Sequence, residues 1–384
     1  MNAHTGHILL FILVLCVGIS ACKAGVKKDS DGGEVNNDTV TDVLPKSKEI
    51  QFEGMESKNG MFDISIEYDD EGVGWLAYSR VQIPKFIDTK IAKSTDRGRT
   101  WKFVTSVGES KEDLIMARGK KTEGVWRDET PCLLFDPTDR KSRRWKLFTN
   151  RYFAAKPFKT KDRLMGDGTI DVKYASSPEG PWSKPECVVG NRSDCKFQLN
   201  KASPELANIR MITEPGAIIH NGVTYLAMDA GTNETGLGDW KNYRVILLAS
   251  SDHGASWRYV GTLLDHSDSS RFGYLVFTGV SLVRANGKLY VLATPSGGVK
   301  KKNKAHDGTM VIEVTDISRA KVKRDKSGKP VIERHAVTDG GSGGLADYDE
   351  KNTGGGMMYS RLSLLGFPRV FRIYQTGSGI LDSK

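Results

Sequence analysis

The sequence predicts an all-β protein, a five-bladed β-propeller of four-stranded antiparallel blades. Two observations support this prediction. Short apolar runs with strand character recur in a fixed order, and no segment of comparable length has helical periodicity. Two copies of the repeat also carry the same turn motif, S-x-D-x-G-x-[T/S]-W. Four-stranded units repeating at about fifty to seventy residues are typical of propeller blades, which leave only short sheet edges.

Each repeat begins with an apolar strand, turns into an aromatic strand and continues into a third. The expected strands are 62–68, 73–79 and 89–94, then 129–135, 144–150 and 172–177, then 214–220, 223–229 and 245–251, then 278–284, 288–294 and 309–315, with a degenerate fifth copy at 355–362 and 369–375. Asn221-Gly222 and Asn286-Gly287 join the first two strands of the third and fourth copies, and Asn-Gly favours a hairpin turn. A β-sandwich with chance similarity among its hairpins is the alternative.

Composition narrows the class of protein. The 384 residues are 38% hydrophobic and 27% charged, which excludes a disordered chain and a polytopic membrane protein. Lys and Arg number 56 against 47 Asp and Glu, a formal charge of +9. This excess is modest and dispersed, so we expect no nucleic-acid binding, only mild attraction to anionic glycans or lipids. One large β domain, residues 49–384, accounts for the body, and we expect a monomer.

The N-terminal region carries the features of an export signal. Residues 8–19 form the only strongly apolar run, too short for the ~20 residues of a bilayer span and typical of a signal-peptide h-region. The run ends in Ile19-Ser20-Ala21-Cys22, which resembles a bacterial lipobox. The resemblance implies a lipoprotein signal peptide over residues 1–22 and a lipid on Cys22. An ordinary signal peptide is the alternative.

The next segment, residues 23–48, is polar and rich in Gly, Asp and Asn, which predicts a flexible tether. We therefore expect an extracytoplasmic protein of the bacterial cell envelope, anchored through its lipid in the outer membrane or facing the periplasm. In an oxidising compartment Cys187 and Cys195 could close a short disulfide loop, whereas Cys132 lies in an apolar run and is expected to be a buried free thiol. No cysteine has metal-site spacing, and we expect no cofactor.

The turn motif occurs at residues 94–101 and 250–257 and resembles the Asp-box of sialidases and other Asp-box propellers. Its Asp accepts turn N–H groups, its Gly permits a positive φ, and its Trp packs between sheets. Residues 176–182 occupy the same place in the second copy and resemble a turn of five-bladed arabinanase and xylosidase-like glycosidases. In these families the turn lies on the outside of the propeller, which implies a structural role for Asp96 and Asp252.

The acids that precede or open the first strand of each blade are the catalytic candidates, because those strands surround the axis. They are Asp63, the pair Asp128-Glu129, and Glu214, and the fourth blade has Thr278 instead. Glycoside hydrolysis uses two carboxyl groups, one protonated and one ionised. Similarity to the arabinanase and xylosidase-like families implies that Asp63 is the base and Glu214 the acid. It implies that Asp128, or else Glu129, is the group that tunes the acid.

This chain departs from that pattern, since Asp63 precedes Ile64 where those families have Asp-Pro, and the second acid is uncertain by one residue. A second resemblance competes. Residues 359–362, Tyr-Ser-Arg-Leu, are similar to the last blade of a sialidase, in which a Tyr attacks the anomeric carbon. That likeness implies Tyr359 as nucleophile, Glu214 as its partner and Asp63 or Asp128 as acid.

Sialidases also clamp the substrate carboxylate with three Arg, for which bidentate guanidinium geometry is well suited. The candidates here are Arg80, Arg127, Arg151 and Arg361, and Trp126 is one of several aromatic residues that could stack on a sugar. The sequence thus predicts an exported glycoside hydrolase with a carbohydrate substrate. A sialidase-like exo-glycosidase and a non-catalytic glycan-binding lipoprotein are the alternatives.

Overall fold

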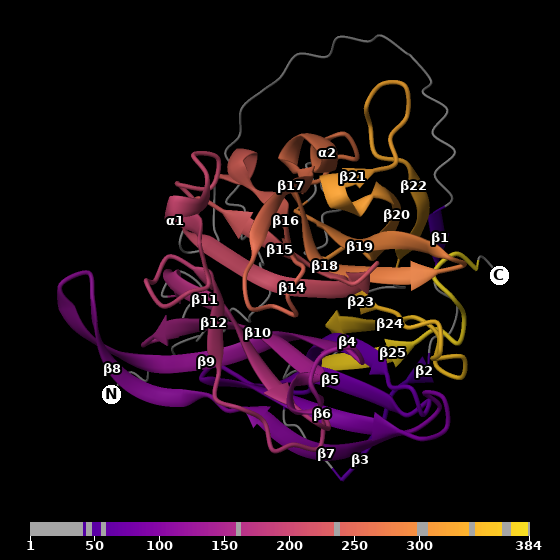
Figure 1. The fold of residues 1–384 in the computed structure, drawn as a ribbon, viewed down its shortest axis with the longest axis horizontal. Coiled ribbons are helices and arrows are strands. Elements are labelled where there is room, and N and C mark those ends of the chain that lie inside the picture. Colours follow the sequence, from indigo (N-terminus) through magenta and orange to yellow (C-terminus); the bar gives the residue numbers. More distant parts are fainter. Residues whose placement is uncertain are drawn as a thin grey trace, which may run out of the picture.

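The chain forms a circular array of five sheets, which confirms the predicted all-β propeller (Figure 1). The computed structural model describes residues 41–43, 48–54, 59–158, 163–233, 239–297, 306–337, 342–362 and 370–382. The predicted signal peptide, Cys22 and most of the tether lie outside the described residues. Within the described part, no helix combines the length and the apolar character that crossing a bilayer requires.

Each blade runs outward from the axis as a sheet of mainly antiparallel strands, to which short outer strands add in parallel in three blades. Blade one has β4 (Met61–Tyr68), β5 (Gly74–Gln82), β6 (Phe86–Ser94) and β7 (Trp101–Gly108), with β3 (Phe52–Glu53) outside. Blade two has β9 (Lys120–Phe135), β10 (Trp145–Ala155), β11 (Arg163–Ala175), β12 (Glu186–Gly190) and β13 (Phe197–Gln198), and β8 (Lys111–Ala117) pairs with the first half of β9. Blade three has β14 (Met211–His220), β15 (Val223–Gly231), β16 (Arg244–Ser250) and β17 (Arg258–Asp265).

The remaining two blades use strands from both ends of the chain. Blade four has β18 (Val276–Ala285), β19 (Lys288–Ser296), β20 (Thr309–Asp316), β22 (Ile332–Val337) and β1 (Thr41–Val43), with β21 (Lys321–Val322) beside β20. Blade five has β23 (Ser342–Asp347), β24 (Met358–Leu362), β25 (Phe371–Gln375) and β2 (Lys48–Glu49). The helical turns are η1 (Lys141–Arg143), α1 (Leu199–Ala202), η3 (Trp240–Asn242), α2 (His266–Ser270) and η4 (Ile317–Arg319).

The ring is closed by the N-terminal strand β2, which supplies the outermost strand of blade five. Ile50 continues this contact, because its N–H donates to the carbonyl of Ile373 at 2.9 Å. Just before it, β1 pairs in parallel with β22 of blade four, although its residues fall within the expected tether. Backbone hydrogen bonds thus hold residues 41–43 and 48–50 against the two last blades.

The innermost strand of every blade contains a β-bulge at the same level. The paired register shifts between Phe62 and Ile64 in β4, and equivalent shifts occur in the other four inner strands. At each bulge one residue has a positive φ: Asp63 (46°), Thr130 (52°), Glu214 (55°), Gly279 (60°) and Leu345 (51°). A bulge adds one residue and redirects a side chain. Five such bulges at one level bring four side chains and the backbone of Gly279 to the axis.

The two Asp-boxes lie on outer turns between the third and fourth strands, as predicted. In blade one, Ser94 Oγ accepts from the Gly98 N–H at 2.9 Å, and Asp96 accepts from the Thr100 N–H at 2.9 Å. Blade three repeats this pattern with Ser250, Asp252, Gly254 and Ser256. Trp101 is buried in the core of blade one. These carboxylates bind their own turns, so their role is structural.

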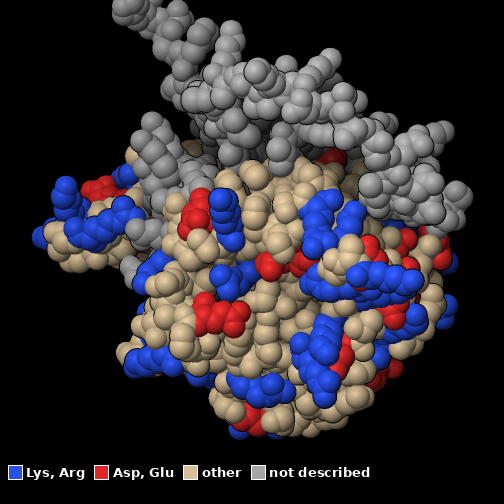
Figure 2. Space-filling model, turned by 90° about the horizontal axis from the view of Figure 1, so that it is seen from above, with Lys and Arg blue, Asp and Glu red and all other residues tan. Residues whose placement is uncertain are grey.

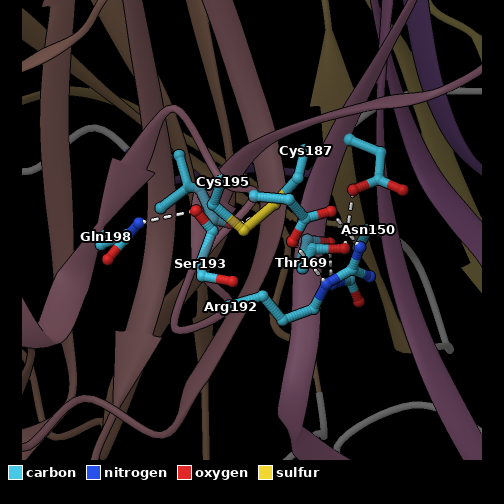
Figure 3. The surroundings of a disulfide bond; sticks show 10 residues. Asn150, Thr169, Cys187, Arg192, Ser193, Cys195 and Gln198 are labelled. Atoms are coloured by element: carbon cyan, nitrogen blue, oxygen red, sulfur yellow. Dashed lines mark hydrogen bonds and ion pairs between the residues drawn. A yellow bond between two sulfur atoms is a disulfide. The ribbon is translucent and has the colours of Figure 1, made fainter.

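The outer edge of blade two is closed by a disulfide between Cys187 and Cys195 (Figure 3). The loop that it closes is further held by Gln198, whose amide donates to the Ser193 carbonyl at 2.9 Å. Cys132 is buried and free, as the sequence predicts. On the face shown in Figure 2, basic and acidic side chains are interspersed.

Candidate active site

The five bulges surround a narrow cavity on the axis. Its lining includes both Asp63 of blade one and Glu214 of blade three, with Thr130 and Gly279 from the blades between and beside them. The structure therefore brings together two acids that are separated by about 150 residues of chain. Their convergence follows from the bulge geometry, because each acid is itself the positive-φ residue of its strand.

Asp63 lies in a strongly acidic and poorly solvated environment. Burial raises the pKa of Asp63 well above its ordinary value, and the nearby charges of Glu129 and Glu214 raise it further. The nearby Ser79 hydroxyl and Thr130 backbone N–H oppose that shift. Like charges this close do not all ionise together. The site therefore retains at least one proton in the pH range where isolated carboxyl groups are ionised.

The consecutive acids of β9 face different surroundings. Glu129 is the one whose charge acts on Asp63. Asp128 lies instead toward Lys173 and Arg151, whose charges partly offset the rise in the pKa of Asp128 caused by burial. These surroundings favour Glu129 over Asp128 as the acid that acts on Asp63.

Glu214 shares its hydrogen-bond donors with Asp229, a carboxyl that the sequence analysis did not select. Glu214 accepts from the Thr278 hydroxyl and from the Gly279 N–H, the latter at 2.5 Å. The same two donors approach Asp229 Oδ2, at 2.5 and 3.2 Å. Burial raises the pKa of Asp229 well above its usual range, and the neighbouring Glu214 raises it further. The feature of the sequence that could have identified Asp229 is its place as an acid at the end of the otherwise apolar second strand of blade three.

His306 is a second residue that the sequence analysis missed. It precedes β20, is 2% exposed, and its ring nitrogens have no hydrogen-bond partner among the described residues. Burial lowers the pKa of His306 to about 4, although the charge of Glu214 opposes this shift. Its ring centroid lies 6.4 Å from that of Phe62. The imidazole is therefore neutral near pH 7 and lies within electrostatic range of Glu214.

Three of the four Arg candidates occupy the same position on the second strands of consecutive blades. Arg361, Arg80 and Arg151 lie opposite residues Gly343, Met61 and Asp128 of the adjoining inner strands. Arg80 approaches Asp88 at 3.7 Å, Arg151 lies over the Trp126 ring at 5.3 Å, and Arg361 lies over the Tyr374 ring at 5.8 Å. Blades five, one and two therefore each carry an arginine at the equivalent position of the second strand.

Arg127, the fourth candidate, is used inside the fold. It is 1% exposed and binds the carbonyls of Lys85 and Pro84 and the hydroxyl of Tyr152 through its three guanidinium nitrogens. These contacts fasten the β5–β6 turn of blade one to blade two.

Two aromatic candidates also have packing roles. Tyr359 is 4% exposed and stacks on Tyr374 at a centroid distance of 5.6 Å. It belongs to the apolar core between blades four and five. It does not line the axial cavity that contains Glu214. Trp126 donates to Asp113 at 3.1 Å and packs edge-on against Phe153.

One other polar cluster resembles a metal site by composition. Asp136, Asp139 and His253 lie close enough together to share an ion. The ammonium of Lys146 already lies 2.8 and 2.9 Å from the two carboxylates. Because Lys146 supplies the positive charge, this cluster is an ion-pair network that joins blade two to the Asp-box of blade three.

Comparison with known proteins adds one curated relative. No family model matches the sequence. A sialidase from Paraclostridium sordellii is 21% identical over 253 residues, which is 65% of this chain and 57% of the sialidase. This chain thus spans little more than half the length of the curated relative that it matches.

Solved structures with a similar arrangement are glycosidases of several families. A family 32 β-fructofuranosidase from Bombyx mori aligns with 82% of this chain and 59% of its own, at 13% identity and a TM-score of 0.49. A family 117 glycoside hydrolase from Zobellia galactanivorans aligns with 88% of this chain and 92% of its own, at 15% identity and a TM-score of 0.46. A Hadza microbial sialidase covers 84% of this chain and is itself covered to 57%, at 11% identity and a TM-score of 0.46.

Proposed function

We propose that this protein is a glycoside hydrolase that acts at the mouth of the axial channel. The observation that carries the proposal is the meeting of Asp63 and Glu214 in one cavity, with Glu129 close enough to shift the pKa of Asp63. Crowded carboxyls of this kind provide the protonated and ionised pair that glycosidic cleavage uses. The similarity to a curated sialidase supports the same class of reaction.

In this mechanism Glu214 protonates the departing glycosidic oxygen and Asp63, once ionised, acts at the anomeric carbon or activates water. The Thr278 hydroxyl and the Gly279 N–H hold the Glu214 carboxyl in place. Ser79 and Thr130 do the same for Asp63.

The test compares the purified protein with Asp63→Asn and Glu214→Gln on a panel of 4-nitrophenyl glycosides and soluble polysaccharides. We expect each variant to lose at least about 100-fold in kcat, the usual scale of acid–base catalysis. Glu214→Gln should lose less on a dinitrophenyl glycoside, whose leaving group needs no proton. The Asp-box variant Asp252→Asn serves as the matched control. Binding without turnover, unaffected by either substitution, would instead identify a glycan-binding protein.

A second candidate is a glycosidase for sugars that carry a carboxylate. Arg361, Arg80 and Arg151 hold equivalent positions on three consecutive blades, an arrangement suited to an anionic substituent, and the curated relative is called a sialidase. Sialosides and uronides belong in the same panel. Preference for them, with a raised KM in Arg361→Ala and Arg80→Ala, would support this candidate over one for neutral sugars.

We further propose that the protein is exported and attached to the cell envelope through Cys22. The lipobox-like sequence and the Cys187–Cys195 disulfide support this, since disulfides persist in oxidising compartments. Mass spectrometry of the N-terminal peptide should find a lipid on Cys22, and Cys22→Ala should release the protein from the membrane fraction. An unmodified cysteine in membrane-bound protein would contradict the assignment.

A further inference from the structure

Asp229 stands out when the second strands of the five blades are compared position by position. In every blade, one residue of the second strand lies opposite the residue that precedes the bulge. These five residues are Ser79, Asn150, Asp229, Thr294 and Ser360. All are small and polar, and blade three alone has a carboxyl group.

This position has a structural task that a neutral side chain performs. Ser79 accepts the N–H of Thr130 at 3.0 Å, and Thr294 accepts the N–H of Leu345 at 2.7 Å. Each bond joins a second strand to the bulge of the following blade. Asp229 makes the same link to Gly279 at 3.2 Å. In blades one and four a hydroxyl accepts this N–H, so the link does not require a carboxyl group.

The carboxyl of Asp229 is costly where it lies. Asp229 is 0% exposed, and Oδ1 has no hydrogen-bond partner among the described residues. Burying an acid without full pairing destabilises the folded state, and a serine would avoid that cost. The stability of the fold therefore gives no reason for an acid at this position. A chemical role for the carboxyl would.

The geometry supplies that role through Glu214. Glu214 Oε2 and Asp229 Oδ2 converge on the same two donors, the Thr278 hydroxyl and the Gly279 N–H. A hydroxyl has one hydrogen, so it cannot stabilise two carboxylate anions at once. A proton shared between the two carboxyls removes one of the two negative charges, so the two donors then face a single anion.

We propose that Asp229 is a positioning residue that shares one proton with Glu214 and thereby keeps Glu214 protonated for its part in catalysis. This inference rests on the proposed glycosidase function and deepens it. Glu214 lines the axial cavity, the site of the proposed reaction, whereas Asp229 is fully buried and is not among the lining residues. The raised pKa of Asp229, caused by burial and by Glu214, agrees with a pair that loses its last proton only at elevated pH.

Three other titratable groups face this pair. The Tyr243 hydroxyl donates to Asp229 at 2.7 Å and stays neutral, because burial raises the pKa of Tyr243 well above its usual value. Asp63 and His306 act on Glu214 from blade one and from the segment before β20. With the tyrosine and the imidazole neutral, Asp63 and Asp229 are the neighbours whose charge changes with that of Glu214, and of these two Asp229 shares its hydrogen-bond donors.

The test uses the residues that the other blades place at this position. Asp229→Ser and Asp229→Asn reproduce blades one and two and keep an acceptor for the Gly279 N–H. We expect both variants to fold, with the alkaline limb of the kcat/KM–pH profile moved at least one pH unit lower. Loss of one acid removes the repulsion between the two carboxyls that favours a shared proton. The loss of rate should be larger on poor leaving groups than on activated ones.

The control is Thr294→Ala, which removes the same blade-to-blade bond in blade four without touching the acids. It should lower the melting temperature and leave the pH profile in place. A profile for Asp229→Ser that superimposes on that of the unmodified protein would overturn the proposal. Titration of 13C-labelled carboxyl groups by NMR gives a readout independent of turnover. The coupled high-pH titration of the pair should vanish in Asp229→Ser, even if the protein proves inactive on every glycoside.

Discussion

The carboxylate of Asp347, on the inner strand of the last blade, accepts a hydrogen bond from the N–H of Ile66, on the inner strand of the first, at 2.7 Å. The same link joins blade two to blade one, where the Leu133 N–H donates to Ser65 at 3.0 Å. Both acceptors lie two residues beyond a bulge. These side chains tie blade five to blade one and blade one to blade two, and Asp347 does so where the ring closes.

The buried carboxyl of Asp347 predicts a pH-dependent stability. Burial raises the pKa of Asp347 to about 7 from an ordinary 3.8. Between these values the folded protein holds a proton that the unfolded chain has lost, so its stability should decrease as the pH rises from about 4 to 7. Asp347→Asn should weaken that slope. Urea unfolding at four pH values would measure it, with the exposed Asp70→Asn as control. An unchanged slope in Asp347→Asn would refute the assignment.

The placement of Glu129 beside Asp63 predicts a shift in the opposite limb of the activity profile. Glu129→Gln removes a negative charge that raises the pKa of Asp63. Asp63 should then ionise at lower pH, and the acidic limb of kcat/KM should move in the same direction. Asp128→Asn is the comparison, because its side chain faces Lys173 and Arg151. A shift in Asp128→Asn and none in Glu129→Gln would reverse the two roles.

Arg127 should affect stability more than substrate binding. Its guanidinium is buried and bound to Pro84, Lys85 and Tyr152. Arg127→Met leaves two backbone carbonyls without their partner, which should cost about 2–4 kcal/mol in the free energy of unfolding. KM should remain unchanged below the unfolding transition. The exposed Arg140→Met should stay within about 0.5 kcal/mol of the unmodified protein. A raised KM at unchanged stability would instead assign Arg127 a role in substrate binding.

The Asp-box of blade three should contribute stability without contributing activity. Asp252 accepts the Ser256 N–H and hydroxyl, and these bonds lower the pKa of Asp252 to about 2. Asp252→Ala should cost roughly 1 kcal/mol near pH 7, in line with other side-chain bonds to turn N–H groups. Since the folded pKa is depressed, this contribution should disappear as the pH falls from about 4 to 2. Thermal unfolding and kcat, measured together, would separate the two effects.

The parts of this protein that short segments encode could be predicted from the sequence. The Asp-box at residues 94–101 is stabilised by bonds that span four residues, so its motif specifies its shape wherever it occurs. The strand order repeats because each blade is a local meander joined by turns. Asp63 and Glu214, which line one cavity, could be selected for the same reason, since both open an apolar strand in equivalent repeats.

Contacts between blades determine the features of the site that the sequence did not predict. The charge of Glu129 is among those that raise the pKa of Asp63. Both acids precede the bulge at Thr130, and a bulge leaves no mark in the strand pattern of the sequence. Asp229 meets Glu214 through a backbone N–H fifty residues away, in the next blade. Local composition determines which strands form. Which side chains reach the axis depends on how five sheets pack around it, and only the closed ring fixes that packing.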